Sequence, residues 1–413
     1  MVPMQMTVAA DTEPQSITAY ASVRDKLPRR VPAAELYSGP PRSYAGASRA
    51  ARPLGPASGG SLAAHRPGAS SAASPIDAQP ANGGAAVKRN LHAGRPSSGG
   101  LSLNVFTEAE LDDIHLSSLE VLERTGVWVE ADDALAIFKD GGCPVDRETR
   151  MVRIPPHLVE EAIRSAPPKN YLCGRDPDHD IVLEAGRVYF SNFDEGIMVV
   201  DLRTGEYRHP VLDDVHDAAR LVDALPDIDT YESAVHPQDV PEETATLHKW
   251  EAAIRNTGKP VGTEATSAYD CRKLIEMATV IAGGEDEFHR RPLIGFGVCP
   301  VSPLKLPRDV TEVVIESARA WCPDTVLSMA MAGGSSPVTL AGTLVLHNAE
   351  VLSGIVLAQL VERGCPVTYG TSTTAMDLKL AAATVGSPEL ALFSAACAQI
   401  AKRYLLPSFV AGL

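Results

Sequence analysis

The pattern of apolar and polar residues changes near Arg187. Beyond that point, short runs of small and β-branched residues alternate with longer amphipathic segments. The strand-like runs lie at 188–193, 230–235, 260–266, 292–299, 325–332 and 366–371, and a seventh begins at 407–412. The helix-like segments lie at 213–224, 242–256, 269–282, 308–321, 338–362 and 388–404. The pattern therefore predicts six strand–helix pairs and one further strand.

This alternation indicates a parallel sheet, because parallel neighbours need a crossover connection that is usually a helix. A doubly wound sheet normally has a glycine-rich phosphate turn after its first strand. Asp194-Glu195-Gly196 follows the first run here, and no G-x-G-x-x-G occurs. Polar or small residues at nearly every strand's carboxyl end fit the rim of a barrel. We predict an α/β fold over 187–413, a TIM-type (β/α)8 barrel that is incomplete at its C-terminus, with parallel strands and an open seam.

A helical lead-in is predicted over 101–186. Thr107 and Glu110 have the spacing of a capping box, and apolar residues follow at helical spacing as far as Arg124. A second helix is predicted over 132–139. A third begins near Ile154, with prolines at its entrance, where a missing N–H costs nothing.

The first hundred residues have a different composition. From 38 to 100 the chain consists mostly of Gly, Ala, Ser, Pro and Arg, with almost no large apolar residue to bury. Such a segment cannot offset the entropy of ordering its backbone. Residues 1–100 are therefore predicted to be a disordered low-complexity tail, and they also fit an over-extended gene start.

Charge separates the same two parts. Residues 1–100 carry 11 Lys/Arg against 5 Asp/Glu, and the remainder carries 26 against 47, which gives the net charge of −15. The acidic part would be repelled by nucleic acid and by anionic membranes, so neither is a predicted partner. The 7 cysteines are widely spaced, with no C-x-x-C pair, which indicates free thiols and a cytoplasmic location. No wholly apolar run reaches about 18 residues, so no membrane span is predicted.

The predicted rim contains carboxylates, aromatics, methionines and small residues, without a nucleophile elbow or a Ser/His/Asp arrangement. His347 and Glu350 are interpreted as a local polar pair on one helix, not as a metal site. Asp214 and His216 match part of a corrinoid-binding D-x-H-x-x-G pattern, but Ala219 occupies the glycine position. The rim therefore indicates a pocket for a compact ligand whose chemistry is supplied from elsewhere.

Several stretches, taken together, are specific to one family. They are L-E-V-L-E-R-T-G at 119–126, the segment 146–155, G-G-S-S-P-V-T-L-A-G at 333–342, H-N-A-E-V-L-S-G-I-V-L-A-Q-L at 347–360 and Y-G-T-S-T-T-A-M-D at 369–377. On these stretches the chain, from about Asn104 onward, resembles the trimethylamine methyltransferase family of corrinoid-dependent enzymes. The resemblance implies a methyltransferase that presents one methyl group of a small N-methylated amine to the Co(I) of a separate corrinoid protein, with no cofactor bound to the chain itself.

The resemblance also implies a kind of binding site. A quaternary nitrogen has no N–H, so aromatic faces and nearby carboxylates hold it. The predicted substrate-binding residues are the aromatics Phe190, Phe193, Tyr231 and Tyr369 and the countercharges Asp194, Glu232 and Glu264. No catalytic residue is predicted, because Co(I) is itself the nucleophile and the protein's task is positioning and electrostatics.

Members of the family continue past the L-P-S-F-V-A-G segment at 406–412. In members that use trimethylamine, this neighbourhood carries pyrrolysine, encoded by an amber codon. We therefore expect a fragmentary gene model, a true truncation or a read-through stop, and favour the first. An ordinary residue there would favour a betaine substrate, which we expect, over trimethylamine. An inactive remnant, a small-ligand-binding barrel and an unrelated barrel lyase or hydrolase stay open, as does homo-oligomerisation.

Overall fold

The computed structural model describes residues 95–96 and 104–411. The chain divides into two compact units, 1–83 and 84–413, and all described residues belong to the second. Apart from the short strand β1 (Arg95–Pro96), the predicted disordered tail lies outside the described residues.

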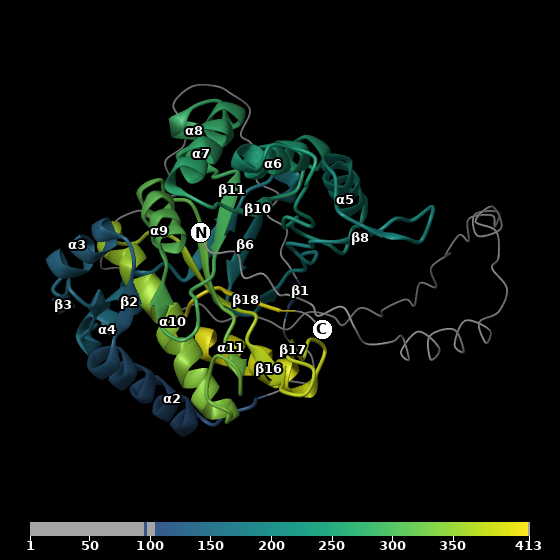
Figure 1. Ribbon diagram of the computed structural model, residues 1–413. Coiled ribbons are helices and arrows are strands. Elements are labelled where there is room, and N and C mark those ends of the chain that lie inside the picture. Colours follow the sequence, from purple (N-terminus) through teal and green to yellow (C-terminus); the bar gives the residue numbers. More distant parts are fainter. Residues whose placement is uncertain (1–94, 97–103, 412–413) are drawn as a thin grey trace, which may run out of the picture. The chain divides into compact units, whose positions relative to one another are not determined.

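A parallel sheet forms the centre of the second unit (Figure 1). Its strands are β10 (Val261–Glu264), β11 (Ile294–Val298), β13 (Asp324–Ser328), β15 (Val367–Thr371) and β18 (Ser408–Val410). They lie side by side in chain order, and each is parallel to its neighbour. The predicted order of parallel strands is confirmed for this part of the chain.

The first two predicted strands join this sheet through isolated bridges. Ser191 pairs with Thr230, and Tyr231 pairs with Val261, both in parallel. The run at 188–193 is not one regular strand, because β7 (Arg187–Val188) pairs antiparallel with β1. The fold is therefore α/β with seven parallel segments in order. Within 104–411 no pairing joins β18 to Ser191, and the TIM-type barrel with an open seam stays a prediction.

Helices connect the parallel segments, as the amphipathic pattern predicts. They are α5 (Leu212–Ala224), η5 (Glu242–Thr244), α6 (Ala245–Asn256), α7 (Ala268–Ala282), α8 (Glu285–Arg290), α9 (Arg308–Arg319), α10 (Leu340–Val361) and α11 (Pro388–Arg403). Each predicted helical segment beyond Arg187 matches one of these to within a few residues at each end.

The prediction of uniformly parallel pairing after Arg187 was wrong. β8 (Val199–Val200) and β9 (Tyr207–Arg208) form an antiparallel hairpin, and so do β16 (Thr374–Asp377) and β17 (Ala382–Ala383). The pair β14 (Met331–Ala332) and β16 is parallel. Both hairpins lie in loops that leave the carboxyl ends of sheet segments. Their strands are too short to produce a period in the sequence.

The lead-in is not purely helical. The predicted helices exist as α2 (Glu108–Glu120), α3 (Asp132–Asp140) and α4 (Pro156–Ser165), with the Thr107–Glu110 capping box in place. The remaining elements are η3 (Val121–Thr125), β2 (Val127–Val129), β3 (Val145–Asp146), β4 (Met151–Val152), β5 (Lys169–Leu172), η4 (Pro177–His179) and β6 (Ile181–Glu184). β12 (Lys305–Leu306) joins β2, β4 and β3 in a small sheet. Strands of two to four residues leave little pattern to detect.

Helix α10 lies in the core. By length and composition it is apolar enough to cross a membrane, but 83% of its most apolar window is buried within the protein. It packs against α2, α4, α9 and β13. Its polar residues His347, Asn348 and Glu350 are fully buried. This packing is typical of the central helix of a folded core.

Candidate functional site

The inner face of the parallel sheet is hollow because several of its residues are glycines. Successive residues of a strand point to opposite faces, so Gly262 and Glu264 share one face of β10. On β11, Gly295 and Gly297 are two residues apart and therefore share one face. A Cβ added at Gly297 would contact no other atom within 4 Å. Barrel interiors normally hold bulky branched residues at such positions. The glycines leave space for a ligand instead.

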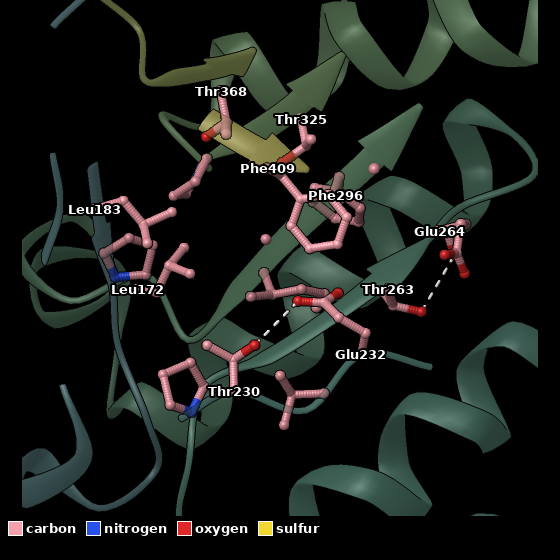
Figure 2. Close-up of a pocket in the computed structure, with 18 of the residues that line it drawn as sticks. Leu172, Leu183, Thr230, Glu232, Thr263, Glu264, Phe296, Thr325, Thr368 and Phe409 are labelled. Carbon is pink, nitrogen blue, oxygen red and sulfur yellow. Dashed lines mark hydrogen bonds between the residues drawn. The ribbon is translucent and has the colours of Figure 1, made fainter. Parts of the chain in front are cut away.

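This space is a pocket of about 730 Å³, counting its opening to solvent. Its lining is mostly apolar, with several threonines and three carboxylates. Lining residues include Leu172, Leu183, Pro292, Pro323, Leu327, Thr325, Thr368, Phe409, Thr230, Thr263, Asp194, Glu232 and Glu264, several of which are drawn in Figure 2. No Lys, Arg or His is among the residues that line this pocket. The geometry therefore favours a cationic ligand with an apolar part.

Glu232 is the most enclosed of the acids. Its carboxylate packs directly over Gly262, where any Cβ would overlap it. The Thr230 hydroxyl donates to Glu232 Oε1 at 3.2 Å (Figure 2). Asn192 holds the backbone, because its amide donates to the Glu232 carbonyl and accepts from the Glu232 N–H. Burial, together with the charges of Glu264 and Asp194, raises the pKa of Glu232 to about 8.

A second acid pair lies at the pocket mouth around a buried lysine. Lys249 of α6 forms ion pairs with Glu195 and with Glu264, the latter with 3.3 Å between Nζ and Oε2. The Lys249 side chain is 3% exposed. Burial and the neighbouring Glu264 carboxyl raise the pKa of Glu195 to about 7, and Lys249 opposes that rise. Glu195 adopts a left-handed backbone (φ 54°), and its N–H donates to the Ser233 carbonyl, which fixes this turn.

The structure brings together the three predicted carboxylates but not the predicted aromatics. Asp194, Glu232 and Glu264 all line the pocket. Tyr231 and Tyr369 are fully buried and do not line this pocket, so the structure does not bring them together with the three acids. The reason is strand alternation: Glu232 and Thr368 point inward, and the residues beside them in sequence must point outward.

The other two predicted aromatics do not line the pocket either. Phe190 is 45% exposed and Phe193 is 80% exposed. The aromatic side chain that enters the pocket from β18 is Phe409, which the sequence reasoning missed (Figure 2). Phe409 belongs to a predicted strand. Because it alternates with Ser408 and Val410 along that strand, the sequence could have placed it on the opposite face from these two residues. Lys249 and Glu195 were missed as well, because their contact joins a helix to a distant loop.

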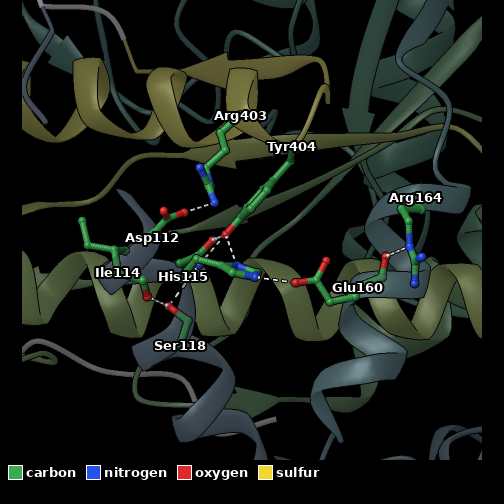
Figure 3. Close-up of polar contacts among 9 residues, drawn as sticks. Asp112, Ile114, His115, Ser118, Glu160, Arg164, Arg403 and Tyr404 are labelled. Atoms are coloured by element: carbon green, nitrogen blue, oxygen red, sulfur yellow. Dashed lines mark hydrogen bonds and ion pairs between the residues drawn. The ribbon is translucent and has the colours of Figure 1, made fainter. Parts of the chain in front are cut away.

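Tyr369 belongs to a buried polar network behind the sheet. Its hydroxyl donates to Asn348 Oδ1 at 2.9 Å, and the Asn348 amide donates to the Tyr404 hydroxyl. Tyr404 in turn bonds His115 Nδ1, and His115 Nε2 lies 2.8 Å from Glu160 Oε1 (Figure 3). Each member has a protein partner, so the network joins α2, α4, α10 and β15 and leaves no free group for a ligand.

His347 and Glu350 do not form the predicted local pair. His347 Nδ1 bonds the Thr373 hydroxyl at 2.8 Å, and burial lowers the pKa of His347 to about 3. Glu350 accepts from Ser302, from Ser328 and from the Leu304 N–H. Across the described part of the chain, no group of three or more His, Cys, Asp or Glu side chains is arranged to hold a metal.

The fold and the pocket define an α/β protein with parallel, sequentially ordered strands and a pocket on the sheet that contains three carboxylates and no basic side chain in its lining. The family model described as "Trimethylamine methyltransferase (MTTB)" matches residues 79–413. The chain belongs to the trimethylamine methyltransferase family, as the sequence resemblance predicts.

Curated relatives agree with this assignment. The chain is 46% identical to "Trimethylamine methyltransferase MttB" of Desulfitobacterium hafniense over 79% of its own length, and it spans 66% of that protein. It is 44% identical to the Methanosarcina thermophila protein of the same name, again over 79% of its own length and 68% of the relative. "Glycine betaine methyltransferase" of D. hafniense is 31% identical over 75% of this chain and 64% of the relative. A solved Methanosarcina barkeri monomethylamine methyltransferase (MtmB) aligns over 73% of this chain and 67% of that one, with 16% identity and a TM-score of 0.44.

Proposed function

We propose that the protein moves a methyl group from a small N-methylated amine to the cobalt of a corrinoid carried by a separate protein, from a pocket inside a (β/α)8-type barrel. The observation that carries this proposal is the pocket itself. It is acidic, contains no basic side chain in its lining and offers no activated nucleophile. Such a site can bind and orient a cation, but it needs a reactant from outside to break a carbon–nitrogen bond.

The residues of the chain supply binding and orientation. Glu232 and Glu264 would face the ammonium charge, and the apolar walls with Phe409 would contact the methyl groups. The corrinoid would supply the electron pair for the new cobalt–carbon bond. The carbon–nitrogen pair would stay on the departing amine, which leaves neutral because the substrate is bound as a cation, either a protonated tertiary amine or a quaternary ammonium. Because the amine leaves uncharged, no strong general acid is needed. The acids therefore act by positioning and by electrostatics.

The pocket favours an amine without a carboxylate over a betaine. A betaine's own carboxylate would enter a lining with Asp194, Glu232 and Glu264 and no basic partner. Bringing like charges together in a partly buried site is costly. The higher identity to trimethylamine methyltransferases, 46% against 31% for the glycine betaine enzyme, points the same way. We therefore propose trimethylamine or a similar amine as substrate, in place of the betaine that the sequence alone led us to expect.

The test measures methyl transfer directly. The protein is mixed with reduced cobalamin or a corrinoid protein and with trimethylamine, tetramethylammonium or glycine betaine, and the absorbance change on cobalt methylation is followed. Because the chain spans 66% of a matched relative, the longest reading frame that contains it is assayed beside the chain itself. Glu232→Gln serves as the pocket variant and Glu206→Gln, an exposed acid outside the pocket, as its matched control.

We expect transfer from trimethylamine, its loss in Glu232→Gln and its retention in Glu206→Gln. Absence of transfer from all three amines would overturn the proposal. Binding of an amine without transfer would then favour a ligand-binding protein. Turnover of the amine without any corrinoid would favour an unrelated lyase or hydrolase.

A further inference from the structure

The buried ion-pair group of Lys249, Glu195 and Glu264 is not explained by substrate contact alone. Lys249 does not line the pocket, yet its ammonium contacts one carboxylate that does. Burying an ammonium is unfavourable unless carboxylates compensate it, and two do so here. The two acids come from different places, Glu195 from the loop after the first sheet segment and Glu264 from β10. Lys249 therefore ties the loop that carries Glu195 to strand β10, which carries Glu264.

We propose that Lys249 is a positioning residue that holds Glu195 and Glu264 in place and sets the pH range over which the pocket accepts a cation. The inference rests on the proposed function for the choice of a methylated ammonium as the ligand. Two neighbouring carboxylates without a cation tend to share one proton. A shared proton turns both oxygens toward each other and weakens the field that reaches the ligand. The Lys249 ammonium opposes this sharing.

All charged and titratable groups around this site bear on the pH dependence. His236 Nδ1 lies 3.9 Å from Glu195 Oε2. The groups that face the three-residue cluster from the surrounding segments are His236, Asp194, Glu232, Tyr231 and Cys299. Burial raises the pKa of Tyr231 and of Cys299 to about 12, so neither titrates near neutral pH. Burial raises the pKa of Glu195 to about 7 and that of Glu232 to about 8, which places both acids in the neutral range.

The wild-type protein should bind a cation more tightly as the pH rises. The pKa of Glu195 is about 7 and that of Glu232 about 8, so both carboxyls are largely neutral at lower pH and ionised at higher pH. A cation attracts only the ionised forms, and its binding releases protons from them. The dissociation constant of tetramethylammonium, measured by calorimetry between about pH 6 and pH 9, should fall through this range.

Lys249→Met should move that transition upward by about one to two pH units, because Glu195 loses the opposite charge that limits its pKa. At about pH 9 the variant should bind the cation at least as tightly as the wild type. Glu195 and Glu264 then no longer have the Lys249 ammonium as an internal counter-ion. Lys249→Arg should keep the wild-type transition. In the double variant Lys249→Met/Glu195→Gln the pair no longer exists, so the transition should return close to its wild-type position.

Lys259→Met is the matched control. Lys259 is equally buried at 4% exposure, but its Nζ donates to the carbonyls of Val222, Leu225 and Ile228, away from the pocket. Its loss should lower the melting temperature and leave the pH transition unchanged. If Lys249→Met does not fold, the pH dependence of cation binding is measured on Glu195→Gln instead. This variant should lose the ionisation step of Glu195 and keep the step of Glu232 at higher pH.

Three results would overturn the inference. These are equal weakening by Lys249→Met at every pH, an unshifted transition in the folded variants, and no binding of tetramethylammonium by the wild type. The methyl-transfer assay is separate. A protein that shows the predicted pH pattern but transfers no methyl group would overturn the proposed function and leave the role of Lys249 standing.

Discussion

The two faces of the parallel sheet treat polar side chains differently. On the outer face, the Tyr369 hydroxyl donates to Asn348, and the Tyr231 hydroxyl accepts from the Ala234 N–H. On the inner face, Glu232 has a single side-chain hydrogen bond, from Thr230, and faces open space. Paired polar groups rigidify a core, whereas a poorly paired carboxylate is costly unless something else neutralises it. The polar groups of the outer face are therefore paired within the fold, whereas the inner face leaves the Glu232 carboxylate facing the pocket.

The largest expected effect comes from removing the inner acid. Glu232→Gln should weaken tetramethylammonium binding about 100-fold at alkaline pH, because the enclosed counter-charge is lost. The melting temperature should not fall, since a neutral amide replaces a group that burial already keeps partly protonated at neutral pH. Calorimetric titration and thermal unfolding on the same samples check both parts. A large loss of stability would show that the inner face also serves the fold.

Asp324 is an exception on the outer face and sharpens the comparison. It is buried, its Oδ1 has no hydrogen-bond partner, and burial raises its pKa to about 7 despite a bond from Ser317. A carboxyl with a raised pKa in the folded state contributes stability at low pH that is lost as the pH rises toward that value. Asp324→Asn should therefore stabilise the protein by on the order of 2 kcal/mol above about pH 7 and by little below about pH 4.

Urea unfolding at these two pH values measures the difference. Glu148→Gln, an exposed acid in the lead-in, is the matched control and should show no such pH dependence. Equal effects of Asp324→Asn at both pH values would contradict the ionisation argument.

The space above Gly262 gives the next prediction. In Gly262→Ala the new methyl group would overlap the Glu232 carboxylate and displace it. We expect about tenfold weaker cation binding, a loss of about 1.4 kcal/mol, with a small change in stability. Gly297→Ala is the control, because its Cβ would enter open space on the same face. Equal weakening in both variants would mean that pocket volume, and not the position of Glu232, determines affinity.

The smallest expected effect is on the outer face. Tyr369→Phe removes one buried hydroxyl from the network with Asn348, which keeps its contact with Tyr404. The free energy of unfolding should fall by about 1 kcal/mol. Cation affinity should stay within about twofold of the wild type, because the ring does not line the pocket. A clear loss of affinity would restore Tyr369 as a binding residue.

The order of the parallel strands could be predicted from the sequence because each strand and its helix produce a local pattern. The run at 292–299 and the helix at 308–321 exist in the structure as β11 and α9 with small changes at their ends. Short elements could not be predicted in this way. β3 and β4 have two residues each, and their pairing depends on contacts across the lead-in.

Candidate site residues could be predicted from the sequence only where their place in a strand determines which face of the sheet they lie on. Glu232 and Glu264 were assigned to the rim at the carboxyl ends of predicted strands, and both line the pocket. Tyr231 was assigned to the same face as its neighbour Glu232, although adjacent strand residues must diverge. Lys249 was invisible in the sequence, because its partner Glu195 is 54 positions away and lies in a left-handed turn.

The composition of α10 has a consequence for biosynthesis. While the chain is being made, Leu340–Val361 leaves the ribosome as a 22-residue apolar segment of the kind that membrane-insertion machinery recognises. Most of its packing partners, α2, α3, α4, α9 and β13, precede it in the chain and have already been synthesised. Their surfaces can take up the helix as soon as it forms. The order of elements along the chain thus places most of the packing surfaces for this apolar helix ahead of its own synthesis.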